Sequence, residues 1–245
     1  MEFTFQGFQN EYNDYGNIEN RIRISIYNNR ANVQRTAELT QIQNEFENLD
    51  VKMRLAFGIS EITLNNEFVS DKQGDLKICH LLYYKLADLW FAYETYIKLF
   101  GRVAGIGKNK IVWLDTAVHN AYATSQTIIN ALALVNNRFT ATYNTIQRKN
   151  DLTAYLNYCL QQATGQQRTR LAAIIAKVGQ VPFSLTHSDV LTIIYAIRNN
   201  FVHNGETTVV PNIFGFRNKG KLLRILYPYL CLVILKSTNL TCNQV

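Results

Sequence analysis

The sequence has few of the residues that interrupt helices. It contains only 3 prolines and 12 glycines among 245 residues. These residue types often end helices and form turns, so a protein built from many strands and tight turns would need more of them. The composition is otherwise that of a globular protein with a buried core, with 47% hydrophobic and 18% charged residues. The scarcity of helix breakers therefore predicts a mostly α-helical fold.

The motifs of several enzyme classes are missing. The sequence contains no G-x-S-x-G nucleophile elbow and no H-E-x-x-H zinc motif. Its 4 cysteines form no C-x-x-C pair, and none has a histidine at the spacing of a zinc finger. His80, His119 and His187 stand alone, which is typical of core or surface histidines. We therefore expect no metal site and no cofactor.

The sequence also lacks a recognisable targeting or membrane segment. Its first residues, MEFTFQGFQNEYND, contain no basic region followed by an apolar run, so they do not resemble a secretory signal. The strongest apolar run, residues 225–235, is too short to span a bilayer and contains Pro228. The cysteine pattern suits small apolar residues in a reducing compartment. These observations predict a cytoplasmic protein that does not act at a membrane.

Acidic residues are absent from the C-terminal segment. The formal net charge is +7, and residues 207–245 contain no Asp or Glu. Such a basic excess is compatible with a phosphate-rich partner such as a nucleic acid. A basic surface that only aids solubility explains the charge equally well.

Apolar periodicity predicts helices over most of the chain. A spacing of three and four residues between apolar positions is typical of a helix with one buried face. The segment 59–75 lacks this spacing, and we expect a loop there with at most one strand. The predicted helices cover residues 33–57, 76–100, 111–136 or 111–148, 151–163, 167–178, 187–203 and 219–239, the last with a kink at Pro228.

The N-terminal residues differ from the rest. Residues 1–31 are rich in Asn, Tyr and Phe, and residues 21–27 alternate between polar and apolar side chains as a strand does. This segment therefore predicts a short strand or hairpin, or a partly ordered arm. We divide the chain into an N-terminal extension, residues 1–70, and a helical bundle, residues 71–245.

The helix predicted over 187–203 concentrates polar side chains near its end. On a helical wheel, Asn199 and His203 lie opposite the apolar arc and are neighbours four residues apart. Arg198 falls inside the apolar margin. Because an unpaired buried charge is costly, the Arg198 side chain must extend to solvent or meet an anion.

These three side chains suit the cleavage of a phosphodiester. An imidazole transfers protons near neutral pH. A guanidinium holds a phosphate through two hydrogen bonds and stabilises transition-state charge. RNA supplies its own nucleophile, the 2′-hydroxyl, so no metal is required. The structural alternative is a helix end with a surface histidine and a salt-bridged arginine.

The segment Ile197-Arg198-Asn199-Asn200-Phe201-Val202-His203-Asn204-Gly205 resembles the signature of the HEPN superfamily. That signature consists of an arginine, then usually a polar residue, then about three further residues and a histidine. It lies near the end of a late helix. This form is similar to HEPN members associated with abortive infection and other defence systems. The predicted context is also similar: long helices, with one more apolar helix after the motif. The resemblance covers about residues 71–245, and its specific part is the quoted segment.

The resemblance implies an activity and a set of site residues. Many members with this motif are metal-independent endoribonucleases that dimerise so that two motifs form one cleft. By this resemblance Arg198 would bind the scissile phosphate, His203 would transfer protons and Asn199 would orient them. Glu94 and Asn200 are the supporting candidates. The basic residues that would contact RNA are Arg217, Lys219, Lys221 and Arg224.

We therefore expect a homodimeric endoribonuclease of toxin or defence type, with RNA as substrate and an antitoxin or another protein as regulatory partner. Two alternatives stay open. The first is a HEPN-like module that binds RNA or a protein without cutting, as other superfamily members do. The second is an unrelated helical protein.

Overall fold

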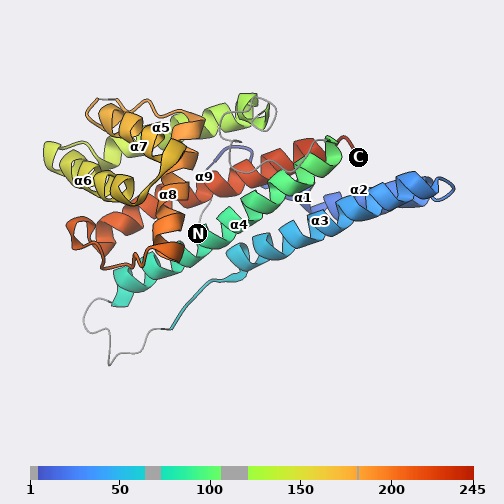
Figure 1. Ribbon diagram of the computed structural model, residues 1–245, viewed down its shortest axis with the longest axis horizontal. Helices are drawn as coiled ribbons and strands as arrows, with labels where there is room; N and C mark the ends of the chain where they lie inside the picture. The colour runs from blue at the N-terminus through green and yellow to red at the C-terminus, as the bar shows by residue number, and fades with distance from the viewer. Residues whose placement is uncertain (1–4, 64–72, 106–120, 181) are drawn as a thin grey trace. The chain divides into compact units, whose positions relative to one another are not determined.

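A computed structural model describes residues 5–63, 73–105, 121–180 and 182–245. These residues form helices and no strand, so the mostly α-helical fold is confirmed (Figure 1). The elements are α1 (Phe8–Gly16), α2 (Ile18–Asn28), α3 (Val33–Gly58), α4 (Gln73–Val103), η2 (Ala121–Thr124), α5 (Gln126–Thr142), α6 (Ile146–Gln162), α7 (Gly165–Val178), α8 (His187–His203), η3 (Asn212–Phe214) and α9 (Phe216–Cys242), where η marks a 3-10 helix.

Most of the predicted helices are present, and several are longer than the apolar pattern indicated. The helix predicted over 187–203 has these same bounds as α8, and the one predicted over 33–57 is α3. Of the helix predicted over 111–136, residues 111–120 lie outside the described part. The remainder is a 3-10 turn followed by α5, which extends to Thr142.

The predicted strand at residues 21–27 is wrong, because this segment belongs to helix α2. Burial explains the error. Ile18 and Ile22, four residues apart, are buried, whereas Ile24 is 52% exposed. The buried positions therefore follow a helical spacing. In a strand, Ile22 and Ile24 would lie on the same face and be buried together, but only Ile22 is buried. An ion pair between Arg23 and Glu19, 2.6 Å apart and also four residues apart, lies on the exposed side of the same helix.

The chain divides into two compact units. The described residues of unit 1 are 5–55, 88–105, 121–131 and 230–245, and those of unit 2 are 56–63, 73–87, 132–180 and 182–229. Helices α3, α4, α5 and α9 contribute residues to both units. The boundary that we predicted at residue 70 lies outside the described residues.

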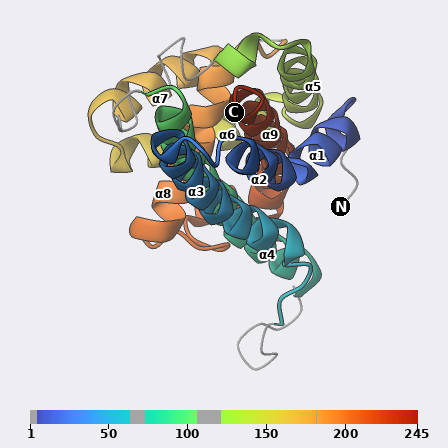
Figure 2. The same cartoon turned by 90° about the vertical axis from the view of Figure 1, so that its right-hand side faces the viewer.

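Unit 1 joins the N-terminal helices to the C-terminal end of the chain. Helices α2 and α3 lie side by side (Figure 1, Figure 2). Glu11 on α1 is buried, and its carboxylate accepts hydrogen bonds from Lys236 Nζ at 2.7 Å and Asn239 Nδ2 at 2.8 Å. These two hydrogen bonds compensate for most of the hydration free energy that the carboxylate loses on burial. These contacts hold α1 against the end of α9.

Unit 2 contains the helices that position the predicted site. Helices α6, α7 and α8 pack against one another, and η3 packs against α6 (Figure 1). Helix α8 buries Val190, Ile193, Ile194 and Ile197, the arc that the helical wheel indicated. This packing fixes the axis and rotation of α8, and therefore the direction in which its last turn presents side chains.

Helix α9 is apolar because it is a core helix. It is long and apolar enough to cross a membrane by length and composition, but 89% of its most apolar window is buried within the protein. The helix runs through Pro228 without ending. Packing therefore accounts for the apolar run between residues 225 and 235.

A capping box begins α8. The Thr186 hydroxyl accepts a hydrogen bond from the Asp189 N–H at 3.2 Å, and the Asp189 carboxylate accepts one from the Thr186 N–H at 2.8 Å. We expect Thr186→Ala to lower the free energy of unfolding by about 1 kcal/mol, the usual value of an N-cap side chain. Urea unfolding followed by circular dichroism measures this loss. An unchanged unfolding midpoint would show that the cap contributes nothing.

Candidate functional site

The last turn of α8 ends in a defined C-terminal cap. Gly205 has a φ of +70°, a conformation that glycine adopts without strain. The N–H of Glu206 donates to the carbonyl of Asn200 at 3.0 Å, and the N–H of Asn204 donates to the same carbonyl at 3.1 Å. The chain therefore turns sharply after His203 and returns into the core at Glu206.

The structure brings together the three side chains that were predicted to be catalytic. Arg198 Nη1 donates to Asn199 Oδ1 at 2.9 Å and lies 3.1 Å from His203 Nε2. An arginine is always protonated and can only donate, so His203 Nε2 must present a lone pair in this arrangement. A neutral His203 then carries its proton on Nδ1. One guanidinium nitrogen thus bridges an amide oxygen and a basic imidazole nitrogen.

The exposure of these residues decreases from the helix end inward. His203 is exposed, Asn199 is half-buried and Arg198 is buried. The Arg198 side chain starts at the apolar margin of α8 and extends to the exposed histidine, as expected for a long cationic side chain.

The two supporting candidates differ in their surroundings. Asn200 is buried, donates to Cys159 Sγ at 3.3 Å and accepts from Asn204 Nδ2 at 3.0 Å, so it points into the core of unit 2. Glu94 belongs to unit 1, where it accepts a hydrogen bond from Trp90 Nε1 at 2.8 Å. Asn200 acts on the geometry of the helix end, and the hydrogen bond between Trp90 and Glu94 lies within unit 1.

A buried polar cluster, which the sequence reasoning missed, follows the motif. Glu206 Oε1 accepts hydrogen bonds from the hydroxyls of Tyr83 at 2.5 Å and Tyr155 at 2.7 Å, and lies 3.5 Å from Lys219 Nζ. The side chains of Glu206 and Lys219 are 0% and 1% exposed. Glu206 is the last acidic residue of the chain. An acid so isolated beside the motif was the signal that could have identified the cluster.

Burial perturbs both charged groups of this cluster. Loss of hydration raises the pKa of Glu206 against the opposing effect of its hydroxyl donors and Lys219. Loss of hydration also lowers the pKa of Lys219, against the opposing effect of Glu206. Both directions show that burial outweighs the attraction between the two groups.

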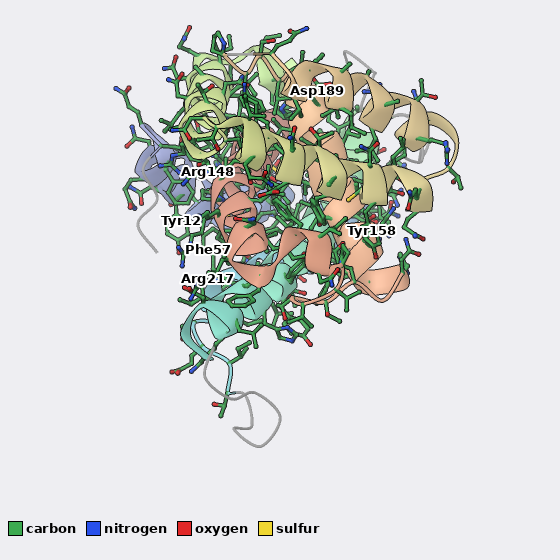
Figure 3. All side chains as sticks on the ribbon, turned by 90° about the vertical axis from the view of Figure 1, so that its left-hand side faces the viewer. Tyr12, Phe57, Arg148, Tyr158, Asp189 and Arg217 are labelled. Atoms are coloured by element: carbon green, nitrogen blue, oxygen red, sulfur yellow. The ribbon has the colours of Figure 1, made fainter. Side chains whose placement is uncertain are left out.

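The position of Lys219 in this cluster corrects one of the four predicted RNA contacts. Lys219 is buried, and its ammonium donates to the carbonyls of Thr207 and Val210, both at 2.6 Å. It therefore holds the loop after the motif and does not face an external phosphate. Arg217, Lys221 and Arg224 are exposed on α9. Arg217 is labelled in Figure 3. It also pairs with Asp75 at 3.2 Å.

Phe201, which belongs to the motif, packs α8 against the first part of α4. Its ring stacks on Tyr83 with centroids 4.9 Å apart, and the edges of Tyr84 and His80 approach it at 5.4 and 6.4 Å. Burial lowers the pKa of His80. Aromatic contacts of this kind add to the apolar area that Phe201 buries, so the aromatic position of the motif has a packing role.

Over the residues that the structure describes, no group of three or more His, Cys, Asp or Glu side chains could hold a metal ion. The described cysteines are all buried, and none of them forms a disulfide; they are Cys79, Cys159, Cys231 and Cys242. Burial raises the pKa of Cys79 to about 12, so this thiol is protonated and unreactive near neutral pH.

Comparisons of the chain with protein-family models, with curated proteins and with solved structures found no match.

Proposed function

We propose that the protein is a metal-independent endoribonuclease of the HEPN type, with Arg198, Asn199 and His203 as its catalytic residues. The observation that carries this proposal is the contact of one guanidinium nitrogen with both Asn199 Oδ1 and His203 Nε2. Resemblance of the motif to HEPN members of defence systems supports a toxin or defence role in the cytoplasm, with an antitoxin or another protein as regulator.

The chemistry follows from the groups present. Arg198 turns its N–H from His203 Nε2 to the phosphoryl oxygens, and the freed Nε2 accepts the proton of the RNA 2′-hydroxyl as that oxygen forms a bond to the adjacent phosphorus. The bond from phosphorus to the 5′-oxygen breaks, and this oxygen takes up a proton as it leaves. Arg198 stabilises the additional negative charge on the phosphoryl oxygens. The products are a 2′,3′-cyclic phosphate and a free 5′-hydroxyl.

Two proton transfers favour a dimer. A single imidazole that has accepted the 2′-hydroxyl proton can deliver it only after moving to the opposite side of the phosphorus. His203 of a second copy would supply the second group at once. We therefore include a homodimer with facing motifs in the proposal.

The wild-type protein tests the reaction class directly. We expect it to cleave single-stranded RNA in the presence of EDTA and to leave DNA of the same sequence intact, because DNA has no 2′-hydroxyl. Product ends are checked by mass spectrometry for the cyclic phosphate. Cleavage that EDTA abolishes, or products with a 5′-phosphate, would contradict the mechanism.

A second candidate function is an RNA-binding module that does not cut. The exposed cations Arg217, Lys221 and Arg224 favour it, because they offer a phosphate-binding surface on α9 that does not require the motif. In this case RNA binds with steep salt dependence and stays intact, and the contact between Arg198 and His203 only stabilises the end of α8.

A further inference from the structure

A small hollow lies in unit 2 where α5 ends and where α6 and α9 begin. It has room for about 10 Å³, the space of a single water, and is partly open to solvent. The residues that line it are Thr142, Tyr143, Arg148, Asp151, Asn218 and Lys221. None of them belongs to the motif cluster.

The hydroxyl of Tyr143 indicates that the hollow takes a polar group. Tyr143 is 3% exposed, and its ring packs between Phe139 and Phe183, with centroids at 5.7 and 6.4 Å. Among the residues that the structure describes, its buried hydroxyl has no hydrogen-bond partner. A buried hydroxyl without a partner is unfavourable. A phenylalanine would fill the same space without this cost. We therefore take the unsatisfied hydroxyl as an indication that the hollow binds a ligand.

The charge around the hollow indicates an anion. Arg148, from the first turn of α6, and Lys221, from the second turn of α9, are both exposed cations. Arg148 Nη1 lies 3.2 Å from Asn144 Oδ1 and 3.4 Å from the carbonyl of Thr142, contacts that keep the guanidinium close to the end of α5. The one carboxylate of the hollow, Asp151, accepts a hydrogen bond from Gln147 Nε2 at 2.7 Å. Two cations thus outweigh one carboxylate.

We propose that this hollow binds a phosphate group, and that the phosphate belongs to the backbone of the RNA substrate at a nucleotide away from the one that is cut. One phosphate oxygen is the size of a water and fits the hollow, where it accepts a hydrogen bond from Tyr143. The other oxygens stay at the mouth between Arg148 and Lys221. The assignment to RNA rests on the proposed function. It adds Arg148 to the exposed cations of α9 and extends the RNA surface onto α6.

Binding to an oligonucleotide that cannot be cut tests the hollow separately from catalysis. A fluorescent single-stranded DNA and a matching RNA are titrated with His203→Ala protein, and anisotropy is followed at several salt concentrations. We expect Arg148→Ala with Lys221→Ala to weaken binding of both by about 10- to 100-fold and to lower the log–log salt slope by about 1 to 2. Tyr143→Phe should weaken binding by about tenfold without lowering the melting temperature, because it removes one hydrogen bond to a charged oxygen.

Two further variants make the test selective. The pair Arg168→Ala and Arg170→Ala removes the same charge from α7, in the same unit, and should weaken binding clearly less. Asp151→Asn removes the opposing carboxylate of the hollow and should strengthen binding severalfold. If Tyr143→Phe binds as tightly as its parent, and loss of Arg148 and Lys221 matters no more than loss of the α7 arginines, the hollow holds only water and the inference fails.

Inorganic phosphate distinguishes the source of the group. If millimolar phosphate raises the melting temperature of the wild type but not of Tyr143→Phe, while neither oligonucleotide binds, the phosphate site stands and its assignment to RNA is overturned. Binding of both oligonucleotides through the hollow without any RNA cleavage by the wild type supports the site and contradicts the proposed endoribonuclease.

Discussion

Replacing His203 by alanine is expected to reduce the rate of RNA cleavage by about 10³-fold, within the range of a general acid or base. The reason is that Nε2, at 3.1 Å from Arg198 Nη1, is the basic atom beside the guanidinium. His203 is exposed, and its ring contacts the polar end of Arg198 rather than the apolar core. The melting temperature and the affinity for a single-stranded DNA should therefore stay close to those of the wild type.

Arginine variants separate charge from geometry at the same site. Arg198→Lys keeps the positive charge but loses the planar fork that holds two phosphate oxygens, so cleavage should fall by about 10²- to 10³-fold. Because Arg198 is buried, the circular dichroism spectrum and melting temperature of the variant must match those of the wild type for the rate to be interpreted.

A matched imidazole provides the control. His80 also lies in unit 2, where its ring approaches Phe201 at 6.4 Å, so it is near the motif. His80→Asn removes an imidazole without touching the contact between Arg198 and His203, and should cleave RNA at close to the wild-type rate. If His203→Ala cleaves as fast as the wild type, the residues of the motif are not the catalytic ones.

The buried cluster behind the motif should have the largest effect on stability. Glu206→Ala removes the acceptor of the Tyr83 and Tyr155 hydroxyls and leaves the Lys219 ammonium beside an empty space. Breaking a buried charged pair on one side costs about 3 to 5 kcal/mol of unfolding free energy. Urea unfolding measures the loss. Glu61→Ala, which removes an exposed carboxylate of the same unit paired with Lys77, should leave the unfolding midpoint unchanged. A midpoint for Glu206→Ala equal to that of the wild type would show that the cluster is not holding the fold together.

The cluster should also make stability depend on pH. Burial raises the pKa of Glu206 in the folded protein above its unfolded value. A raised pKa means that the folded state holds the proton more tightly, so this contribution is fully present below the unfolded glutamate pKa and is lost as the pH rises through the folded pKa. Glu206→Gln has no such proton. We expect its stability relative to the wild type to increase as the pH rises from about 4, the ordinary range of glutamate, toward neutrality.

The opposite trend would overturn this view of the cluster. If Glu206→Gln loses stability relative to the wild type as the pH rises, the pKa of Glu206 is lowered in the folded protein. The attraction of Lys219 would then outweigh burial. Unfolding curves at several pH values, with Glu61→Ala as the control, measure the difference between the two variants and the wild type.

Local spacing was sufficient to predict most of the helices after residue 32 and to indicate the residues of the candidate site. The apolar positions of α8 and its capping box lie within a few residues of one another, so their interactions are present in the sequence itself. The contact between Arg198 and His203 joins residues five apart on one helix. Helix geometry directs the two side chains to different sides, and the length of the arginine side chain bridges the separation.

What depends on distant residues was decided only by the tertiary structure. Alternation at residues 21–27 is compatible with a strand or a helix, and burial of Ile18 and Ile22 decides for the helix. In the sequence, Lys219 is one of several cations in a basic segment. The structure shows that it is surrounded by Glu206 and by the carbonyls of Thr207 and Val210. Glu206 meets Tyr83, 123 residues earlier in the chain. The physical reason is that burial and charge pairing are properties of the whole packed unit, whereas helix formation is set by neighbours within one or two turns.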